Sequence, residues 1–160
     1  MRLILLKIKA RYLLLLETMF DIDSLSESWS VGYLNHETGE VLNLPNFYNY
    51  NLADPFIFEY EGTDYCFVEK FDFKSNGEIH VYDLNLNVYL GLALKEDFHL
   101  SYPFVFSHND KIYMLPETSE NKDIRLYESK NFPLEWELSA ILINDIRAVD
   151  SMLFYDDYES

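Results

Sequence analysis

The sequence predicts an all-β protein built as a partial β-propeller of four-stranded antiparallel blades. Three observations predict this fold. Tyr and Phe number 13 and 12 among 160 residues, and they lie in short alternating segments of the kind that form strands. Turn signals separate these segments at short intervals. Residues 53–72 and 100–120 contain nearly the same sequence motif, with matching positions 48 apart. A fixed period of this length is typical of propeller blades.

The first clear repeat unit covers residues 54–96. "PFIFEY" and "YCFVEKF" flank a turn that contains Gly62, which predicts a hairpin. After a turn at 75–78, "IHVYDL" and "VYLGLAL" supply a third and a fourth strand. Four antiparallel strands within one period predict a single blade, with "PFIF" innermost and "VYLGLAL" at the outer rim.

The second unit, residues 102–144, repeats this order with "PFVFSH", "KIYMLPE", "IRLYES" and "WELSAILI". A further blade is predicted to start at Asp150, in "VDSMLF". Because propellers close with ~4–8 blades, these units predict an incomplete ring. We therefore expect the chain to be a fragment of a longer protein and inactive alone.

We divide the chain into an N-terminal segment, residues 1–27, and the partial propeller, residues 28–160. "WSVGYLN" and "EVLNL" match a third and a fourth strand, with Tyr33 placed on Tyr82. The N-terminal segment is open to two interpretations. It is either a degenerate blade, with residues 3–6 as the first strand and 11–24 as the second, or a charged amphipathic helix or strand.

Charge and cysteine content exclude several functions. Lys plus Arg number 12 and Asp plus Glu number 28, so the net charge is −16, which argues against nucleic acid and anionic membranes as partners. Charges interrupt the apolar N-terminus, so we expect no membrane insertion, no signal peptide and a cytoplasmic location. Cys66 is the single cysteine and predicts a buried strand residue. The histidines lack metal-ligand spacing, so no metal and no cofactor are expected.

Four carboxylates recur in repeat register: Asp54, Glu69, Glu117 and Asp150. A radial fold would bring them towards one axis, and glycoside hydrolysis uses two carboxylates held across a sugar. The alternative interpretation is that each acid caps a strand end by accepting backbone N–H groups beside Pro. Both interpretations stay open at this point.

Three further residues are candidates for binding substrate. Tyr102 stands at the position of Asp54 in the second unit. His80 and Arg125 lie on matching third strands, each followed by an apolar residue and Tyr. We expect them to line a wet groove or, alternatively, a solvated sheet face.

Several ordered motifs between residues 28 and 155 carry a resemblance to a known family. "WSVGY", the two repeated phrases, "FPLEWEL" and "AVDSMLF" resemble the N-terminal propeller domain of glucosamine inositolphosphorylceramide transferase and its bacterial relatives. That domain is similar in turn to the five-bladed arabinanase, xylosidase and invertase-like propellers. The resemblance implies five blades, with acids where innermost strands begin.

Carried over by position, the resemblance gives Asp54 the place of a general base and Tyr102 the place where hydrolases hold a second acid. Asp150 follows in the next unit, with Ser151 in place of the usual Pro. No segment supplies the general acid, so the hydrolase set is incomplete. The candidate catalytic residues are therefore Asp54 and Asp150, and the candidate substrate-binding residues, from repeat register and matching strands as well, are Glu69, Tyr102, Glu117, His80 and Arg125.

The resemblance implies a carbohydrate-active or carbohydrate-binding propeller linked to glycan or glycoconjugate synthesis, with a sugar or sugar conjugate as partner. The alternative is a non-catalytic scaffold or protein-interaction domain. An incomplete ring would expose strand edges, so we also expect self-association through them.

Overall fold

The computed structural model describes residues 4–10, 28–36, 38–47, 49–72 and 74–154. Within them the protein is all-β, with strands in three antiparallel sheets and one short 3₁₀ turn, η1 (Ser119–Asn121). This confirms the all-β, antiparallel part of the predicted fold class. None of the described residues belongs to a helix long and apolar enough to span a membrane.

The first sheet has the order β1-β2-β3. Its strands are β1 (Ile4–Ala10), β2 (Ser28–Leu34) and β3 (Val41–Asn43). β1 pairs directly with β2, whereas the degenerate-blade alignment places residues 3–6 on a first strand. That alignment is wrong, because β1 occupies the place that a second strand takes beside a third strand. Residues 11–24 lie outside the described residues.

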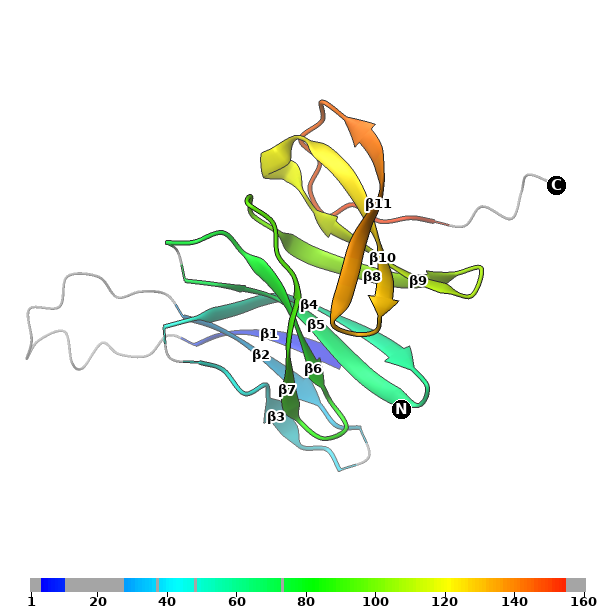
Figure 1. The fold of residues 1–160 in the computed structure, drawn as a ribbon. Helices are drawn as coiled ribbons and strands as arrows, with labels where there is room; N and C mark the ends of the chain where they lie inside the picture. Colours follow the sequence, from blue (N-terminus) through cyan, green and yellow to red (C-terminus); the bar gives the residue numbers. More distant parts are fainter. Residues whose placement is uncertain (1–3, 11–27, 37, 48, 73, 155–160) are drawn as a thin grey trace, which may run out of the picture.

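The second and third sheets follow the two predicted repeat units. The second sheet contains β4 (Asn51–Tyr60), β5 (Thr63–Phe71), β6 (Glu78–Asp83) and β7 (Val88–Leu94) in sequence order. The third contains β8 (Ser101–His108), β9 (Lys111–Glu117), β10 (Asp123–Asn131) and β11 (Glu135–Asn144), again in sequence order. Each sheet is therefore a simple meander whose consecutive strands are neighbours (Figure 1).

Two apolar clusters join the three sheets face to face, because side chains alternate between the two faces of each strand. On one face of the second sheet, Cys66, Val68 and Tyr82 pack with Val31 and Tyr33 of the first sheet. On its other face, residues such as Phe67, Ile79 and Val81 pack with residues of the third sheet. The third sheet contributes Val105, Met114 and Tyr127. The second sheet is thus buried on both faces, and its Cys66 thiol is fully enclosed, which raises its pKa to about 12.

The junctions between sheets correct one detail of the predicted alignment. Trp29 N–H donates to Asn51 Oδ1 (2.8 Å), and Gly77 N–H donates to His99 Nδ1 (2.9 Å). These equivalent contacts set a shift of 48 residues, so Tyr33 corresponds to Val81. The predicted match of Tyr33 with Tyr82 is wrong by one residue, and a slip of one residue moves a side chain to the opposite face of a sheet.

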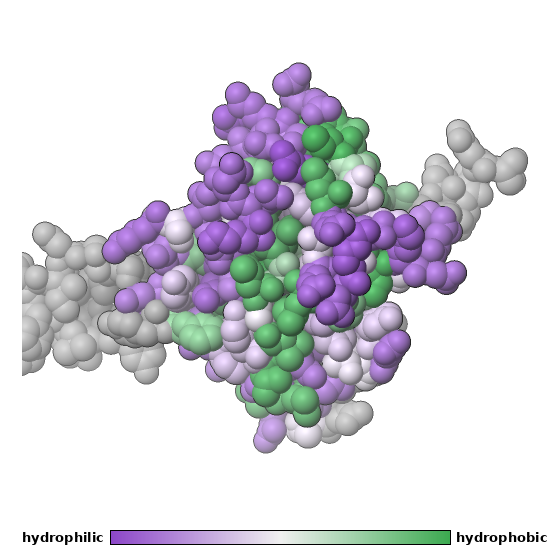
Figure 2. All heavy atoms as spheres, viewed as in Figure 1, coloured by the Kyte–Doolittle hydropathy of each residue, from purple (hydrophilic) through white to green (hydrophobic). Residues whose placement is uncertain are grey.

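The outer strands β7 and β11 are sheet edges, as predicted. Figure 2 shows apolar side chains gathered over them. The exposed apolar residues of these strands are Val88, Leu90, Leu92, Leu138, Ile141, Leu142 and Ile143. Within the described part of the chain, no strand pairing joins the first sheet to the third, so the sheets do not close on themselves. Residues 151–154 are irregular rather than a strand, and the remainder of that predicted strand is outside the described residues.

Candidate functional site

An unusual backbone conformation recurs where each repeat begins. Asp54, Tyr102 and Asp150 have φ values of 45°, 45° and 50°, in the left-handed region that residues other than Gly rarely adopt. The first two lie in β-bulges, because the ladders shift register between Ala53 and Phe56 and again between Ser101 and Phe104. Bulges re-aim side chains and are common beside functional sites. The predicted equivalence of the three positions is therefore visible in the backbone.

Glu117 lies between two of these positions. Its Oε2 accepts a hydrogen bond from the Asp150 N–H (3.2 Å). Burial raises the pKa of the Glu117 carboxyl, and the carboxylates of Asp150 and Asp54 raise it further, while the Asp150 N–H and His99 oppose the rise. Three of the predicted acids thus form one electrostatic group.

Glu69, at the end of the preceding sheet's second strand, is buried and ion-paired to His99. Glu69 Oε1 is 2.9 Å from His99 Nε2, and the His99 N–H donates to Glu120 Oε2. The hydrogen bond to Glu69 raises the pKa of His99 against the opposing effect of burial, and the charges of Glu69, Glu120 and Glu117 add to the rise. His99 therefore links Glu69 to the acid group around Glu117.

Gly77 holds the other side of the His99 ring. Its N–H donates to His99 Nδ1 (2.9 Å) while that ring is neutral. A Cβ on Gly77 would lie 2.5 Å from Leu100 O, 2.8 Å from His99 Cε1 and 2.9 Å from Glu69 Oε1. The "SNGE" segment is thus more than the turn that the sequence predicts, because only Gly lets the chain approach this closely.

Tyr102 contacts the segment that follows Asp150. Its hydroxyl donates to Met152 Sδ at 3.2 Å, so the second and third repeat starts touch through side chains. Tyr102 is half-buried. The structure therefore places Asp54, Glu117, Asp150, Tyr102 and, through His99, Glu69 in one region, which we call the repeat-start cluster.

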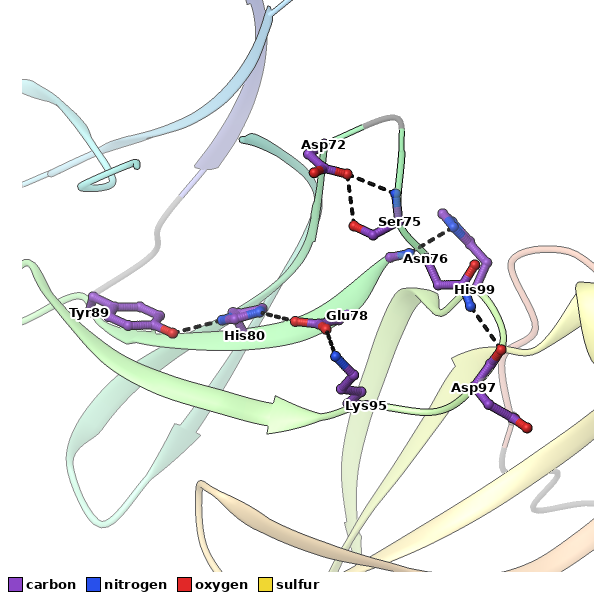
Figure 3. Close-up of polar contacts among 10 residues, drawn as sticks. Asp72, Ser75, Asn76, Glu78, His80, Tyr89, Lys95, Asp97 and His99 are labelled. Carbon is purple, nitrogen blue, oxygen red and sulfur yellow. Dashed lines mark hydrogen bonds and ion pairs between the residues drawn. The ribbon is translucent and has the colours of Figure 1, made fainter. Parts of the chain in front are cut away.

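His80 belongs to a different network (Figure 3). Its Nδ1 is 2.8 Å from the Tyr89 hydroxyl and its Nε2 is 3.2 Å from Glu78 Oε2, and Glu78 Oε1 is 2.5 Å from Lys95 Nζ. Burial lowers the pKa of His80, with a partly opposing effect of Glu78. Since His80 is only 4% exposed, neither the wet groove nor the solvated face predicted for it describes its position.

Arg125 also has its own partners on the third sheet. Its Nε is 2.8 Å from Asp123 Oδ2, and its guanidinium lies 4.8 Å from the centroid of the Phe98 ring. A longer contact of 3.9 Å reaches Glu96 Oε1. These contacts tie Arg125 to the connection between β7 and β8, and none of them is to a member of the repeat-start cluster.

The repeat-start cluster offers hydrogen-bond acceptors, a tyrosine and a histidine, which suit a ligand rich in hydroxyl groups. Among the described residues, no group of three or more His, Cys, Asp or Glu side chains has the geometry to hold a metal ion. Sequence reasoning missed His99 and Gly77. The signal available for both was the repeat itself, because Trp29 stands 48 residues before Gly77 and Asn51 stands 48 residues before His99.

Three packed antiparallel sheets, with polar residues gathered where successive sheets begin, define a repeat β-protein with a candidate site shared between repeats. A family model described as the N-terminal region of glucosamine inositolphosphorylceramide transferase 1 matches residues 17–159. The chain belongs to this family, which confirms the resemblance seen in its motifs.

Plant proteins are among its relatives. The chain is 41% identical over 110 residues to glucosamine inositolphosphorylceramide transferase 1 of rice, Oryza sativa subsp. japonica, and 39% identical over 111 residues to that of Arabidopsis thaliana. Each match covers 66% of this chain but only 15% of the rice protein and 14% of the Arabidopsis protein. No solved structure matches the chain.

Proposed function

We propose that this chain is a carbohydrate-binding part of a β-propeller that serves glycoconjugate synthesis, and that the repeat-start cluster is its binding site. The observation that carries the proposal is the recurrence of one strained backbone conformation at Asp54, Tyr102 and Asp150, with the Glu117 carboxylate between two of them. Strained, repeated positions that gather polar groups point to a ligand rather than to stability.

The propeller arrangement is part of the proposal. Four-stranded meanders packed face to face in chain order, with β4 in contact with β8, are the geometry expected of neighbouring blades. In this arrangement residues 28–160 form blades of a five-bladed ring, and β4 and β8 are innermost. The family to which the chain belongs supports a link to sugar conjugates, since the relatives it matches are named glucosamine inositolphosphorylceramide transferase 1.

Within this site, Asp54 and Asp150 accept hydrogen bonds from sugar hydroxyls, and Tyr102 offers a ring and a hydroxyl. Glu117 is the member best suited to donate a proton, because its pKa is raised by burial and by the two aspartates. Glu69 acts through His99 as a positioning residue. His80 and Arg125, proposed from the sequence as binding residues, have separate partners and are left out of this site.

The experiment is a binding screen with a panel of neutral methyl glycosides, followed by ligand-observed NMR. The wild-type chain is expected to bind at least one glycoside, and Asp54→Asn and Glu117→Gln are expected to weaken that binding at least tenfold. Glu59→Gln, an acid of the same strand outside the cluster, serves as the control. Absence of binding in the whole panel would favour the second candidate, a non-catalytic scaffold. The exposed apolar residues of the edge strands β7 and β11 support this alternative.

A further inference from the structure

A lysine on the second sheet lies among three aromatic rings. Lys70 Nζ is 4.2 Å from the centroid of the Tyr50 ring, 4.5 Å from that of Phe47 and 5.9 Å from that of Tyr89. Phe47 and Tyr89 also pack edge to face, with centroids 5.1 Å apart. Because neighbouring strand residues point to opposite faces, Lys70 lies across the sheet from Glu69 and the repeat-start cluster.

The ammonium group of Lys70 has no oxygen partner within the part of the chain that the structure describes. Its contacts there are the three ring faces, although an ammonium carries three donors. Burial lowers the pKa of Lys70, and Glu78 raises it. An ammonium whose protein neighbours are ring faces keeps its donors available to an acceptor that approaches from solvent.

The local charge balance leaves Lys70 available to an anion. Glu78, the carboxylate that acts on it, is already bonded to Lys95 at 2.5 Å and to His80 at 3.2 Å. Burial lowers the pKa of His80, and with its ring neutral the group of Lys70, Glu78, Lys95 and His80 carries one net positive charge. That is notable on a chain of net charge −16, where most of the surface repels anions.

Hydrogen bonds fix the conformation of the loop that supplies two of the rings. Asn46 Oδ1 accepts from the Phe47 N–H (2.8 Å), and its Nδ2 donates to Tyr50 O (3.0 Å). The Tyr50 N–H donates to Phe47 O, and Asn49 adopts a left-handed φ of 68°. Phe47 and Tyr50 are nevertheless 45% and 39% exposed, so this short loop holds two aromatic rings partly in water.

We propose that Lys70, Phe47, Tyr50 and Tyr89 form a second site, which binds an anionic sugar bearing a phosphate. The phosphate accepts from the Lys70 ammonium, a compact cation suited to phosphate. The apolar face of the sugar ring covers the exposed aromatic surface, which contributes through burial. This site is separate from the repeat-start cluster and does not depend on it.

The test is isothermal titration of the full chain with glucose 1-phosphate, inorganic phosphate, methyl glucoside and uridine monophosphate. We expect glucose 1-phosphate to bind at least tenfold more tightly than the other three. Lys70→Met should weaken it at least tenfold, and Lys70→Arg should retain most of the affinity. Lys130→Met is the control, because Lys130 is a paired lysine on the third sheet.

Phe47→Leu should also weaken binding, since it removes a ring but no charge. Glu59→Gln, which lies outside both sites, should leave it unchanged. Absence of binding, equal loss in the Lys70 and Lys130 variants, equal affinity for inorganic phosphate, or tighter binding of uridine monophosphate would each overturn the proposal. Circular dichroism of every variant shows whether a loss of affinity reflects unfolding. If Lys70→Met is unfolded, the proposal is judged on the two milder variants: Lys70→Arg must retain most of the affinity and Phe47→Leu must weaken it.

Discussion

Two histidines, His80 on β6 and His99 just before β8, have environments that shift their pKa in opposite directions. Burial lowers the pKa of His80 below its ordinary value of 6.5, whereas the hydrogen bond to Glu69 raises that of His99 above it. By linkage, stability from a buried neutral histidine is present above pH 6.5 and is lost as pH falls below it. Stability from the His99–Glu69 pair is present below pH 6.5 and is lost as pH rises through the folded-state pKa.

We therefore predict that His80→Gln flattens the loss of stability between about pH 7 and 5, and that His99→Gln flattens the loss above about pH 6.5. Urea unfolding of wild type and both variants across this range measures the two slopes. If the two substitutions change the same limb of the pH profile, the assignment of opposite environments is wrong.

Gly77 provides a second prediction at the scale of a residue. A methyl group there meets Leu100 O, His99 and Glu69 within 3 Å, so Gly77→Ala should lower the free energy of unfolding by about 1–3 kcal/mol, the usual cost of overpacking. Gly62→Ala is a matched control. Its Cβ would meet open space, so any loss of stability there comes from the backbone conformation, with φ at +79°, and not from a steric clash. Denaturant unfolding compares the two. A neutral Gly77→Ala would mean that the two sheets separate easily at this point.

At the scale of an element, the β10–β11 hairpin packs on the second sheet through Phe132 and Trp136. The Phe132 ring lies 4.8 Å from that of Tyr60, 4.9 Å from that of Tyr65 and 5.8 Å from that of Phe58. Such clusters contribute through buried area and edge-to-face geometry. The hairpin thus holds the third sheet against the second at the end distant from the repeat-start cluster.

We predict that Phe132→Ala lowers the free energy of unfolding by about 3 kcal/mol. Phe154→Ala is the control, because Phe154 is 86% exposed and should change stability by less than about 0.5 kcal/mol. Thermal and denaturant unfolding measure both variants. Equal effects of the two substitutions would show that the hairpin does not hold the sheets together.

The order of the strands was predictable from the sequence, and the reason is physical. Each strand of the second and third sheets pairs with its neighbour in the chain, so alternation and turn residues suffice to define "PFIFEY" or "IHVYDL". The first sheet was less predictable, because β1 pairs with β2 across a long intervening segment and leaves no local signal. Alignment by Tyr33 alone also misjudged the register by one residue, since the periodic contacts that fix it involve backbone groups.

The site was predictable to the same extent. Repeat register brought Asp54, Glu117 and Asp150 together, because equivalent positions in packed sheets meet. His80 was assigned to a groove, yet the Glu78 and Tyr89 contacts that bury it come from neighbouring positions that the pattern does not distinguish from a solvated face. His99 was missed because its function in the fold depends on Gly77, which the sequence presents as an ordinary turn residue.

At the scale of the whole molecule, two apolar sheet edges and a large negative charge act against each other. β7 and β11 each end a sheet, and their exposed residues include Leu92, Leu138 and Ile141. Unpaired apolar edges favour pairing with another chain, while a net charge of −16 opposes it. We expect self-association through these edges to rise with ionic strength, because screening shortens the Debye length from ~10 Å at 0.1 M to ~3 Å at 1 M salt.

Sedimentation velocity at low and high salt measures this association. Ile141→Lys, which places a charge on the β11 edge, should suppress it, whereas Lys74→Ala, in the turn between β5 and β6, should not. A chain that stays monomeric at high salt, or an Ile141→Lys variant that associates as strongly as wild type, would contradict the expectation.

The most direct test of the central claim is amide chemical-shift mapping of the ¹⁵N-labelled chain during titration with the best-binding neutral glycoside. The proposal predicts that the largest shifts fall on the amides of the repeat starts and their partners, above all Asp54, Gly77, Tyr102 and Asp150, and that Glu117→Gln reduces them. Shifts confined to β7 and β11, or no shifts at saturating sugar, would contradict the assignment of the repeat-start cluster as a carbohydrate site.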